Sequence, residues 1–137
     1  MPAKIGKKMT QVAQGGSIEI TAANFGSHAA ADGITIVDFW AEWCGPCRQF
    51  GPIFEEASNR HPNITFGKVN TEVERELANE ANITSIPTLM AFRDGILLYN
   101  RPGAMNAAGF EELIAAIEGL DMDAVRAELA SQQEANA

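Results

Sequence analysis

The chain has 137 residues, 46% of them hydrophobic, and a formal net charge of −8 at pH 7. This length fits one domain that buries a core without structural disulfides or a metal. The acidic balance excludes nucleic acid as a main partner, because phosphate binding needs a basic surface. The chain contains neither a membrane-length apolar run nor a secretory signal pattern. We therefore expect a cytoplasmic protein that binds neither nucleic acid nor a membrane.

The first elements begin after a polar, glycine-bearing stretch. Residues 1–16 show no sustained periodicity and predict a flexible N-terminal arm. Ile18 and Ile20 alternate with polar neighbours, which indicates a short strand. Thr21 or Asn24 can cap a helix that follows.

Residues 34–40 are β-branched and aromatic, which predicts a central strand covered on both faces. Asp38 is the one charged exception in this run. A helix is expected from Cys44 to residues 59–63, with a proline in its first turn and Pro52 further in, where we expect a kink.

The next strand is expected at residues 64–70, in a βαβ unit with the first. Residues 71–74 have the pattern of a capping box, which predicts a helix that runs from there to about Ala81. Asn82 then stands where a left-handed C-cap is wanted, and asparagine tolerates that conformation.

The last third of the chain predicts a hairpin and two helices. Residues 87–92 and 96–99 flank an Asp-Gly pair and predict antiparallel strands joined by a tight turn. Apolar residues at helical spacing after Asn106 predict a long amphipathic helix. Residues 121 to about 131 predict one more helix, for which packing on its own domain or fraying in water is favoured over partner binding.

The two cysteines, Cys44 and Cys47, are the strongest chemical signal. At i and i+3 on a helix they lie on one face, close enough for a reversible disulfide. So short a loop stabilises a fold by only roughly 2 kcal/mol. A CxxC that follows a strand and opens a helix therefore indicates a redox pair.

Five landmarks, in their order and spacing, resemble the thioredoxin family. They are residues 37–47, Pro52, Lys68, the Ile-Pro-Thr at 86–88, and Gly103. The resemblance covers roughly three quarters of the chain. It implies a thioredoxin-like α/β fold, with a central mixed sheet of about five strands flanked by about four helices, plus an extra C-terminal helix. We place the thioredoxin domain at 17–120 and the C-terminal extension at 121–137.

The resemblance implies a general protein-disulfide reductase. Unpaired N–H groups and the helix dipole favour a thiolate at Cys44, which attacks, while Cys47 resolves the mixed disulfide. The resemblance associates the Gly45 and Pro46 pair with reductants. It also implies disulfide-containing client proteins and an NADPH-dependent thioredoxin reductase, with no cofactor beyond the redox-active disulfide. We expect a monomer. We expect no metal site, because neither histidine stands at ligand spacing from the cysteines.

Two charged residues are expected to support the cysteines. Asp38 shares a face of the buried strand with Trp40, so desolvation should raise its pKa and allow it to carry a proton for Cys47. The alternative is a strand-end aspartate that faces solvent. Lys68 matches the lysine that the family has on the neighbouring strand, and we expect it to compensate that carboxylate partly.

The client groove is implied by the resemblance. Pro87 matches the family's cis-proline, and the backbone of Ile86 would bind an extended client strand. Trp43 and Gly103 would line the same groove, whereas Trp40 is expected to be scaffold. Pro102 departs from the family pattern, which has an apolar residue with a free N–H before the glycine.

Two other functions remain as alternatives. A scaffold or chaperone-like binding subunit would use the groove or the last helix without the thiols, and the intact CxxC argues against it. An oxidase or isomerase is disfavoured by the two residues between the cysteines and by the missing signal pattern.

Overall fold

The computed structural model describes residues 16–135, so nearly all of the predicted N-terminal arm lies outside the described residues. Five strands and five helices are found within this range. The strands are β1 (Ser17–Glu19), β2 (Ile34–Trp40), β3 (Thr65–Asn70), β4 (Thr88–Arg93) and β5 (Ile96–Pro102). The helices are α2 (Phe25–Ala30), α3 (Gly45–Arg60), α4 (Arg75–Glu80), α5 (Ala107–Glu118) and α6 (Met122–Ala135).

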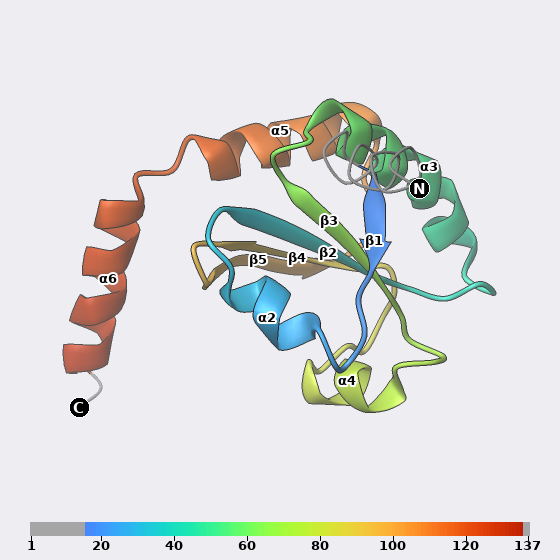
Figure 1. The fold of residues 1–137 in the computed structure, drawn as a ribbon, viewed down its shortest axis with the longest axis horizontal. Coiled ribbons are helices and arrows are strands. Elements are labelled where there is room, and N and C mark those ends of the chain that lie inside the picture. The colour runs from blue at the N-terminus through green and yellow to red at the C-terminus, as the bar shows by residue number, and fades with distance from the viewer. Residues whose placement is uncertain (1–15, 136–137) are drawn as a thin grey trace, which may run out of the picture.

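The strands form one mixed sheet in the order β1-β3-β2-β4-β5. β3 pairs in parallel with β1 and β2, whereas β4 pairs antiparallel with β2 and β5. Helices α3 and α5 cover one face, and α2 and α4 cover the other (Figure 1). The prediction of a mixed sheet with helices on both faces and an extra C-terminal helix is confirmed.

The central strand contributes to a separate core on each face of the sheet. Ile34 and Ile36 belong to the cluster under α3 and α5, while Val37 and Phe39 belong to the cluster on the α2 and α4 face. This alternation follows from the two-residue period of a strand. A buried central strand was therefore correctly predicted from an almost continuous apolar run.

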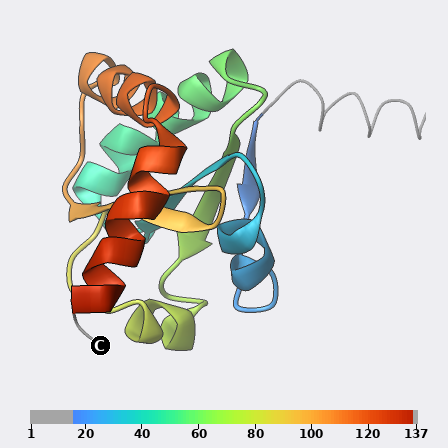
Figure 2. The same cartoon turned by 90° about the vertical axis from the view of Figure 1, so that its left-hand side faces the viewer.

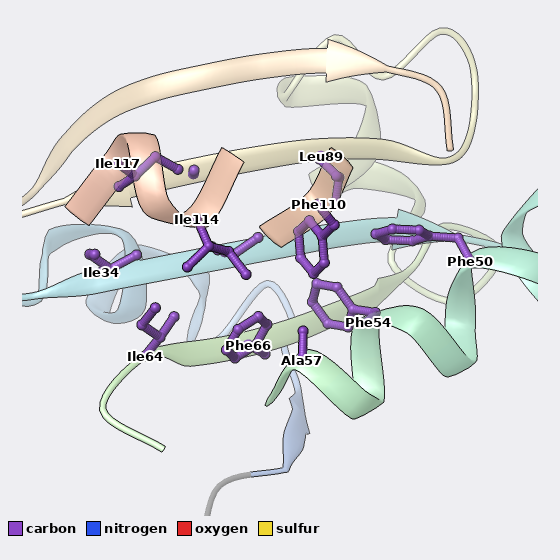
Figure 3. Close-up of a cluster of buried hydrophobic side chains, with 12 residues drawn as sticks. Ile34, Phe50, Phe54, Ala57, Ile64, Phe66, Leu89, Phe110, Ile114 and Ile117 are labelled. Carbon is purple, nitrogen blue, oxygen red and sulfur yellow. The ribbon is translucent and has the colours of Figure 1, made fainter. Parts of the chain in front are cut away.

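Aromatic rings fill the larger core. Phe50 and Phe54 project from α3 toward Phe110 of α5 (Figure 3). The ring centroids of Phe50 and Phe110 are 5.2 Å apart at an interplanar angle of 74°, an edge-to-face arrangement that favours the pair beyond its area burial. This packing fixes α3, whose N-terminal end carries the cysteines, against the sheet.

Local signals predicted the left-handed backbone at residues 94–95 and 82 correctly, whereas the side-chain cap of α5 was not predicted. Asp94 and Gly95 both have positive φ, 52° and 81°, as a two-residue hairpin turn requires. Asn82, one residue after the C-cap of α4, has φ of 58°. The side chain of Asn106 accepts the N–H of Gly109 at 2.7 Å and caps α5.

The capping box predicted at residues 71–74 is wrong. The hydroxyl of Thr71 donates to the carbonyl of Trp40 at 3.1 Å, and α4 begins only at Arg75, with Glu74 as an N-cap that makes no side-chain hydrogen bond. Thr71 follows β3 directly, beside the end of the parallel β2. Its side chain is therefore used to join two strand ends, which the sequence pattern does not reveal.

The cap of α2 also differs from expectation. Asn24 occupies the N-cap position, but its side chain makes no capping hydrogen bond to the helix. Its oxygen accepts the backbone N–H of Thr21 at 2.8 Å, and the hydroxyl of Thr21 accepts the N–H of Ala23. Both side chains therefore stabilise the turn between β1 and α2.

The predicted C-terminal helix is present as α6, beyond the hairpin end of the sheet (Figures 1 and 2). Met122 is its one buried residue among those described, and Val125 is partly covered. Arg126 lies 3.5 Å from the carboxylate of Asp94 in the hairpin turn. The helix thus contacts its own chain, which agrees with the favoured expectation that it packs on its own domain. The domain boundary at residue 120 stays a prediction.

None of the described helices has both the length and the apolar character needed to cross a membrane.

A glycine on β3 permits the close approach of the first strand. A Cβ on Gly67 would overlap the Cγ1 and Cδ1 atoms of Ile20, which is fully buried. We predict that Gly67→Ala lowers the free energy of unfolding by about 1 to 3 kcal/mol, because the overlap displaces a core side chain. Urea denaturation measures this loss.

Two further variants test the steric cause. Gly26→Ala is the control, since a Cβ there meets no atom within contact distance. Combining Gly67→Ala with Ile20→Val should cost less than the sum of the single changes, because the smaller side chain relieves the overlap. Strict additivity of the two losses would contradict the explanation.

Candidate functional site

The redox pair lies where the central strand passes into α3. Cys44 is the N-cap of this helix, and its sulfur accepts the backbone N–H of Cys47 at 3.2 Å. The two residues form a disulfide with their Cα atoms 5.2 Å apart. Each side chain is only 4% exposed. The expectation that the cysteines meet at the start of a helix is confirmed.

The two residues between the cysteines allow the helix to start there. Pro46 stands in the first turn, where its missing N–H leaves no helical hydrogen bond unmade. The N–H groups of this turn that lack a helical acceptor include that of Cys47, which donates to the sulfur of Cys44. Together with the helix dipole they stabilise negative charge on that sulfur, which favours a thiolate after reduction.

A loop that is distant in sequence from the cysteines lies next to the sulfur of Cys44. The Ile86-Pro87 peptide bond is cis, as the resemblance implied. The sulfur of Cys44 lies 3.7 Å from the carbonyl oxygen of Ile86. Gly103, with φ of 115°, donates its N–H to the carbonyl of Pro87 at 2.8 Å. The structure therefore brings together Cys44, Ile86, Pro87 and Gly103.

Trp43 stands between two hollows next to the disulfide, and 66% of its surface is exposed. One hollow of about 390 Å³ is lined by Trp43, Thr71, Ala78, Ile83, Thr84, Ser85 and Ile86. The other, of about 620 Å³, is lined by Glu42, Trp43, Asn70, Glu72 and Val73. Both have Trp43 in their walls, which agrees with its assignment to a surface rather than to the core.

Sequence reasoning missed several of these lining residues. Residues 83–85 could have been found from their closeness to Pro87 in the chain. Val73 carried no such signal. It reaches the site because the backbone N–H of Thr71 bonds to the carbonyl of Trp40, which holds the β3 to α4 connection beside residues 40–43.

Asp38 is completely buried, and neither of its carboxylate oxygens has a hydrogen-bond partner among the described residues. Burial disfavours the charged form and raises the pKa of Asp38 from 3.8 to about 7, although the positive charge of Lys68 acts in the opposite direction. The alternative of a solvent-facing aspartate is thereby wrong. Trp40, two residues further on the same face, packs against the small buried cluster of Ala41, Cys44 and Cys47.

Lys68 is the register partner of Asp38 on the neighbouring strand. Its ammonium nitrogen lies 4.7 Å from the ring centroid of Trp40, within cation–π range. Because both Asp38 oxygens lack a partner in the described chain, this ammonium forms no direct ion pair with that carboxylate. The compensation is therefore a charge interaction over some distance, and it leaves the effect of burial dominant.

Neither histidine lies at the redox site. His61 contacts the carboxylate of Glu111 at 2.8 Å, at the junction of α3 and α5. Glu111 also accepts from Arg60, which lowers the pKa of the carboxyl group. Within residues 16–135, no three histidine, cysteine or acidic side chains gather in a way that could hold a metal ion.

Comparisons with known proteins agree with one another. The thioredoxin family model matches residues 16–116. The chain is 44% identical over 117 residues to a thioredoxin 2 homologue of Streptomyces coelicolor, covering 85% of this chain and 87% of that one. It is 45% identical to a thioredoxin of Chlamydia pneumoniae, over 56% of this chain and 74% of the other.

A solved structure extends the likeness to the fold. The thioredoxin of Malassezia sympodialis matches with a TM-score of 0.68 at 29% identity, covering 77% of this chain and 94% of that one.

The buried carboxyl group predicts a pH dependence of stability. The folded state retains the Asp38 proton up to about pH 7, whereas the unfolded chain releases it near 3.8. Stability should therefore fall as pH rises from about 4 to about 7, by at most about 4 kcal/mol, and then level off. Urea unfolding of oxidised wild type and Asp38→Ala, between pH 4 and 9, measures the difference.

The variant isolates this one group from all others that titrate. Asp38→Ala should gain stability over wild type with increasing pH, because no buried carboxylate must ionise. An offset between the two proteins that is the same at both ends of the pH range would contradict the prediction.

Proposed function

Because the chain belongs to the thioredoxin family and is a thiol-disulfide oxidoreductase, we propose that it reduces many client proteins with Cys44 as nucleophile and Cys47 as resolving thiol. The observation that carries these roles is the N-cap geometry of Cys44, whose sulfur accepts the Cys47 N–H. That hydrogen bond and the helix dipole favour the thiolate at Cys44 over one at Cys47.

The reaction transfers two electrons in two exchange steps. The Cys44 thiolate attacks one sulfur of a client disulfide, forms a mixed disulfide and releases the other client sulfur as a thiolate. Cys47 then loses its proton and attacks the sulfur of Cys44. This breaks the mixed disulfide and releases the second client thiolate. The client is reduced by two electrons, and the Cys44–Cys47 disulfide is formed.

Asp38 is proposed as the base that takes the Cys47 proton. The absence of a hydrogen-bond partner within residues 16–135 and the pKa of about 7 support this role, because a base works best when its pKa lies near the working pH. Lys68 limits the rise of that pKa through its positive charge. Gly45, Pro46 and Pro87 shape the site around the two sulfurs.

Clients are proposed to bind as extended segments over Trp43, Ile86 and Gly103. The closeness of Cys44 to the Ile86 carbonyl supports this placement, since a strand that pairs with the Ile86 backbone would bring its disulfide to Cys44. The exposed ring of Trp43 adds an apolar contact next to it. Pro102, which has no N–H, leaves one wall of the groove without a donor.

Recycling is proposed to come from an NADPH-dependent flavoprotein thioredoxin reductase, which returns two electrons to the Cys44–Cys47 disulfide. The pair then needs no further cofactor. We place the protein in the cytoplasm as a monomer, where a reducing environment keeps such a dithiol available.

The competing function is a scaffold or chaperone-like subunit that binds through the groove without using its thiols. Replacing both cysteines by serine separates the two. A reductase loses its activity toward disulfides, whereas a scaffold keeps its client binding.

Insulin reduction tests the proposed roles of the two cysteines. With dithiothreitol as electron donor, wild type should accelerate insulin reduction, and Cys44→Ser should fall to the uncatalysed rate because the attacking sulfur is missing. Cys47→Ser should still attack and accumulate as a covalent mixed disulfide with insulin, visible on a non-reducing gel. Equal turbidity growth with wild type and Cys44→Ser would refute the mechanism.

The proposed transfer of the Cys47 proton to Asp38 is tested by a variant that cannot act as a base. Asp38→Asn should slow the second step by up to about 100-fold near pH 7 and leave the first attack nearly unchanged, because the base acts only on Cys47. Stopped-flow kinetics separate the steps. Identical rates for variant and wild type from pH 6 to 9 would count against the proton role of Asp38.

A further inference from the structure

Three charged side chains lie in one row across β1, β3 and β2. Lys68 is the register partner of Asp38 on one side and of Glu19 on the other. Register partners on neighbouring strands point to the same face of a sheet. The row is therefore carboxylate, ammonium, carboxylate, with Lys68 between two acidic groups.

The two carboxylates have opposite surroundings. Asp38 is fully buried and has no hydrogen-bond partner in the described chain, whereas Glu19 is exposed at the edge strand. A pocket of about 250 Å³ joins the outer part of the row to solvent and is lined by Ser17, Ile18, Glu19, Trp40, Lys68 and Asn70. Lys68 thus stands between a buried acid and a pocket that contains the other acid.

Among the described residues, Lys68 forms no direct ion pair with either carboxylate of the row. Its ammonium nitrogen lies over the ring of Trp40 and under α3, where a Cβ on Gly51 would be 4.0 Å away. This position leaves the ammonium open to attraction from either side, because a lysine stem is long and flexible.

We propose that Glu19 is a positioning residue of the redox site, which draws the Lys68 ammonium toward the pocket and so keeps it from neutralising the Asp38 carboxylate. The proposal rests on the proposed role of Asp38 as the base for Cys47. With Glu19 present, Asp38 keeps the proton affinity that the resolving step needs. Without Glu19, Lys68 has one carboxylate left in its row, and ionised Asp38 becomes more stable.

Other groups around Asp38 do not replace this effect. Its partner on β4 is the apolar Leu89. From α3, the carboxylate of Glu55 is bound to the backbone N–H and the hydroxyl of Ser17, which lies outside the row. In the described chain, Lys68 and Glu19 are therefore the charged members of the Asp38 row.

The test is a titration of the Asp38 carboxyl carbon by NMR in the oxidised protein, where neither cysteine titrates. Four proteins form a double-mutant cycle: wild type, Glu19→Gln, Lys68→Met and the combined variant. We expect Glu19→Gln to lower the Asp38 midpoint by a few tenths of a pH unit in the wild-type background. In the Lys68→Met background the same change should have no effect.

Two controls guard against a general loss of charge or fold. Glu55→Gln removes an acidic group near β1 but outside the row, and should leave the midpoint unchanged. Glu19→Asp keeps the charge and should retain most of the wild-type midpoint. An unchanged midpoint in Glu19→Gln overturns the proposal. So does an equal shift in both backgrounds, which would make Glu19 a distant charge that acts without Lys68.

A kinetic measurement links the row to the reaction. The pH profile of the resolving step in Glu19→Gln should move to lower pH by the same amount as the titration. If the Asp38 titration shifts but the pH profile of the resolving step does not, Glu19 has no role in the reaction. The proposed roles of the two cysteines are not affected by that result. A failure of the proposed cysteine roles would be seen separately, as equal insulin reduction by wild type and Cys44→Ser.

Discussion

Desolvation of a single carboxyl group connects the core of this protein with the role that we propose for Asp38 at the redox site. Asp38 belongs to β2, the strand that is buried on both faces, and its oxygens find no hydrogen-bond partner in the described chain. The same burial that gives the sheet its stability makes ionisation of Asp38 unfavourable. Burial thus raises the pKa of this carboxyl group to about 7, and its charged form destabilises the fold.

The end of β2 determines where the other parts of the redox site lie. The strand ends at Trp40, and the chain then turns so that Cys44 caps α3. The antiparallel neighbour β4 begins just after Pro87, so the Ile86 carbonyl reaches the sulfur of Cys44. Two segments more than 40 residues apart therefore form one surface, because the start of one strand lies beside the end of the other.

The far end of the sheet is built with different interactions. Arg93 donates to the carbonyls of Ile117, Glu118 and Leu120 and so satisfies the C-terminal end of α5. Arg126 of α6 reaches the hairpin turn at Asp94. These contacts lie at the opposite end of β4 from Pro87, which separates the attachment of the last helix from the redox site.

The sequence by itself determined the elements with a strong local cause. The apolar run of β2, the Asp94-Gly95 turn and the cysteine pair at a helix start each follow from neighbouring residues. Only the tertiary structure decided where polar side chains bond. Thr71 binds the end of β2 instead of capping α4, and Glu19 joins the row of Lys68 and Asp38. Such partners come from distant strands, and strand register depends on packing that no local pattern records.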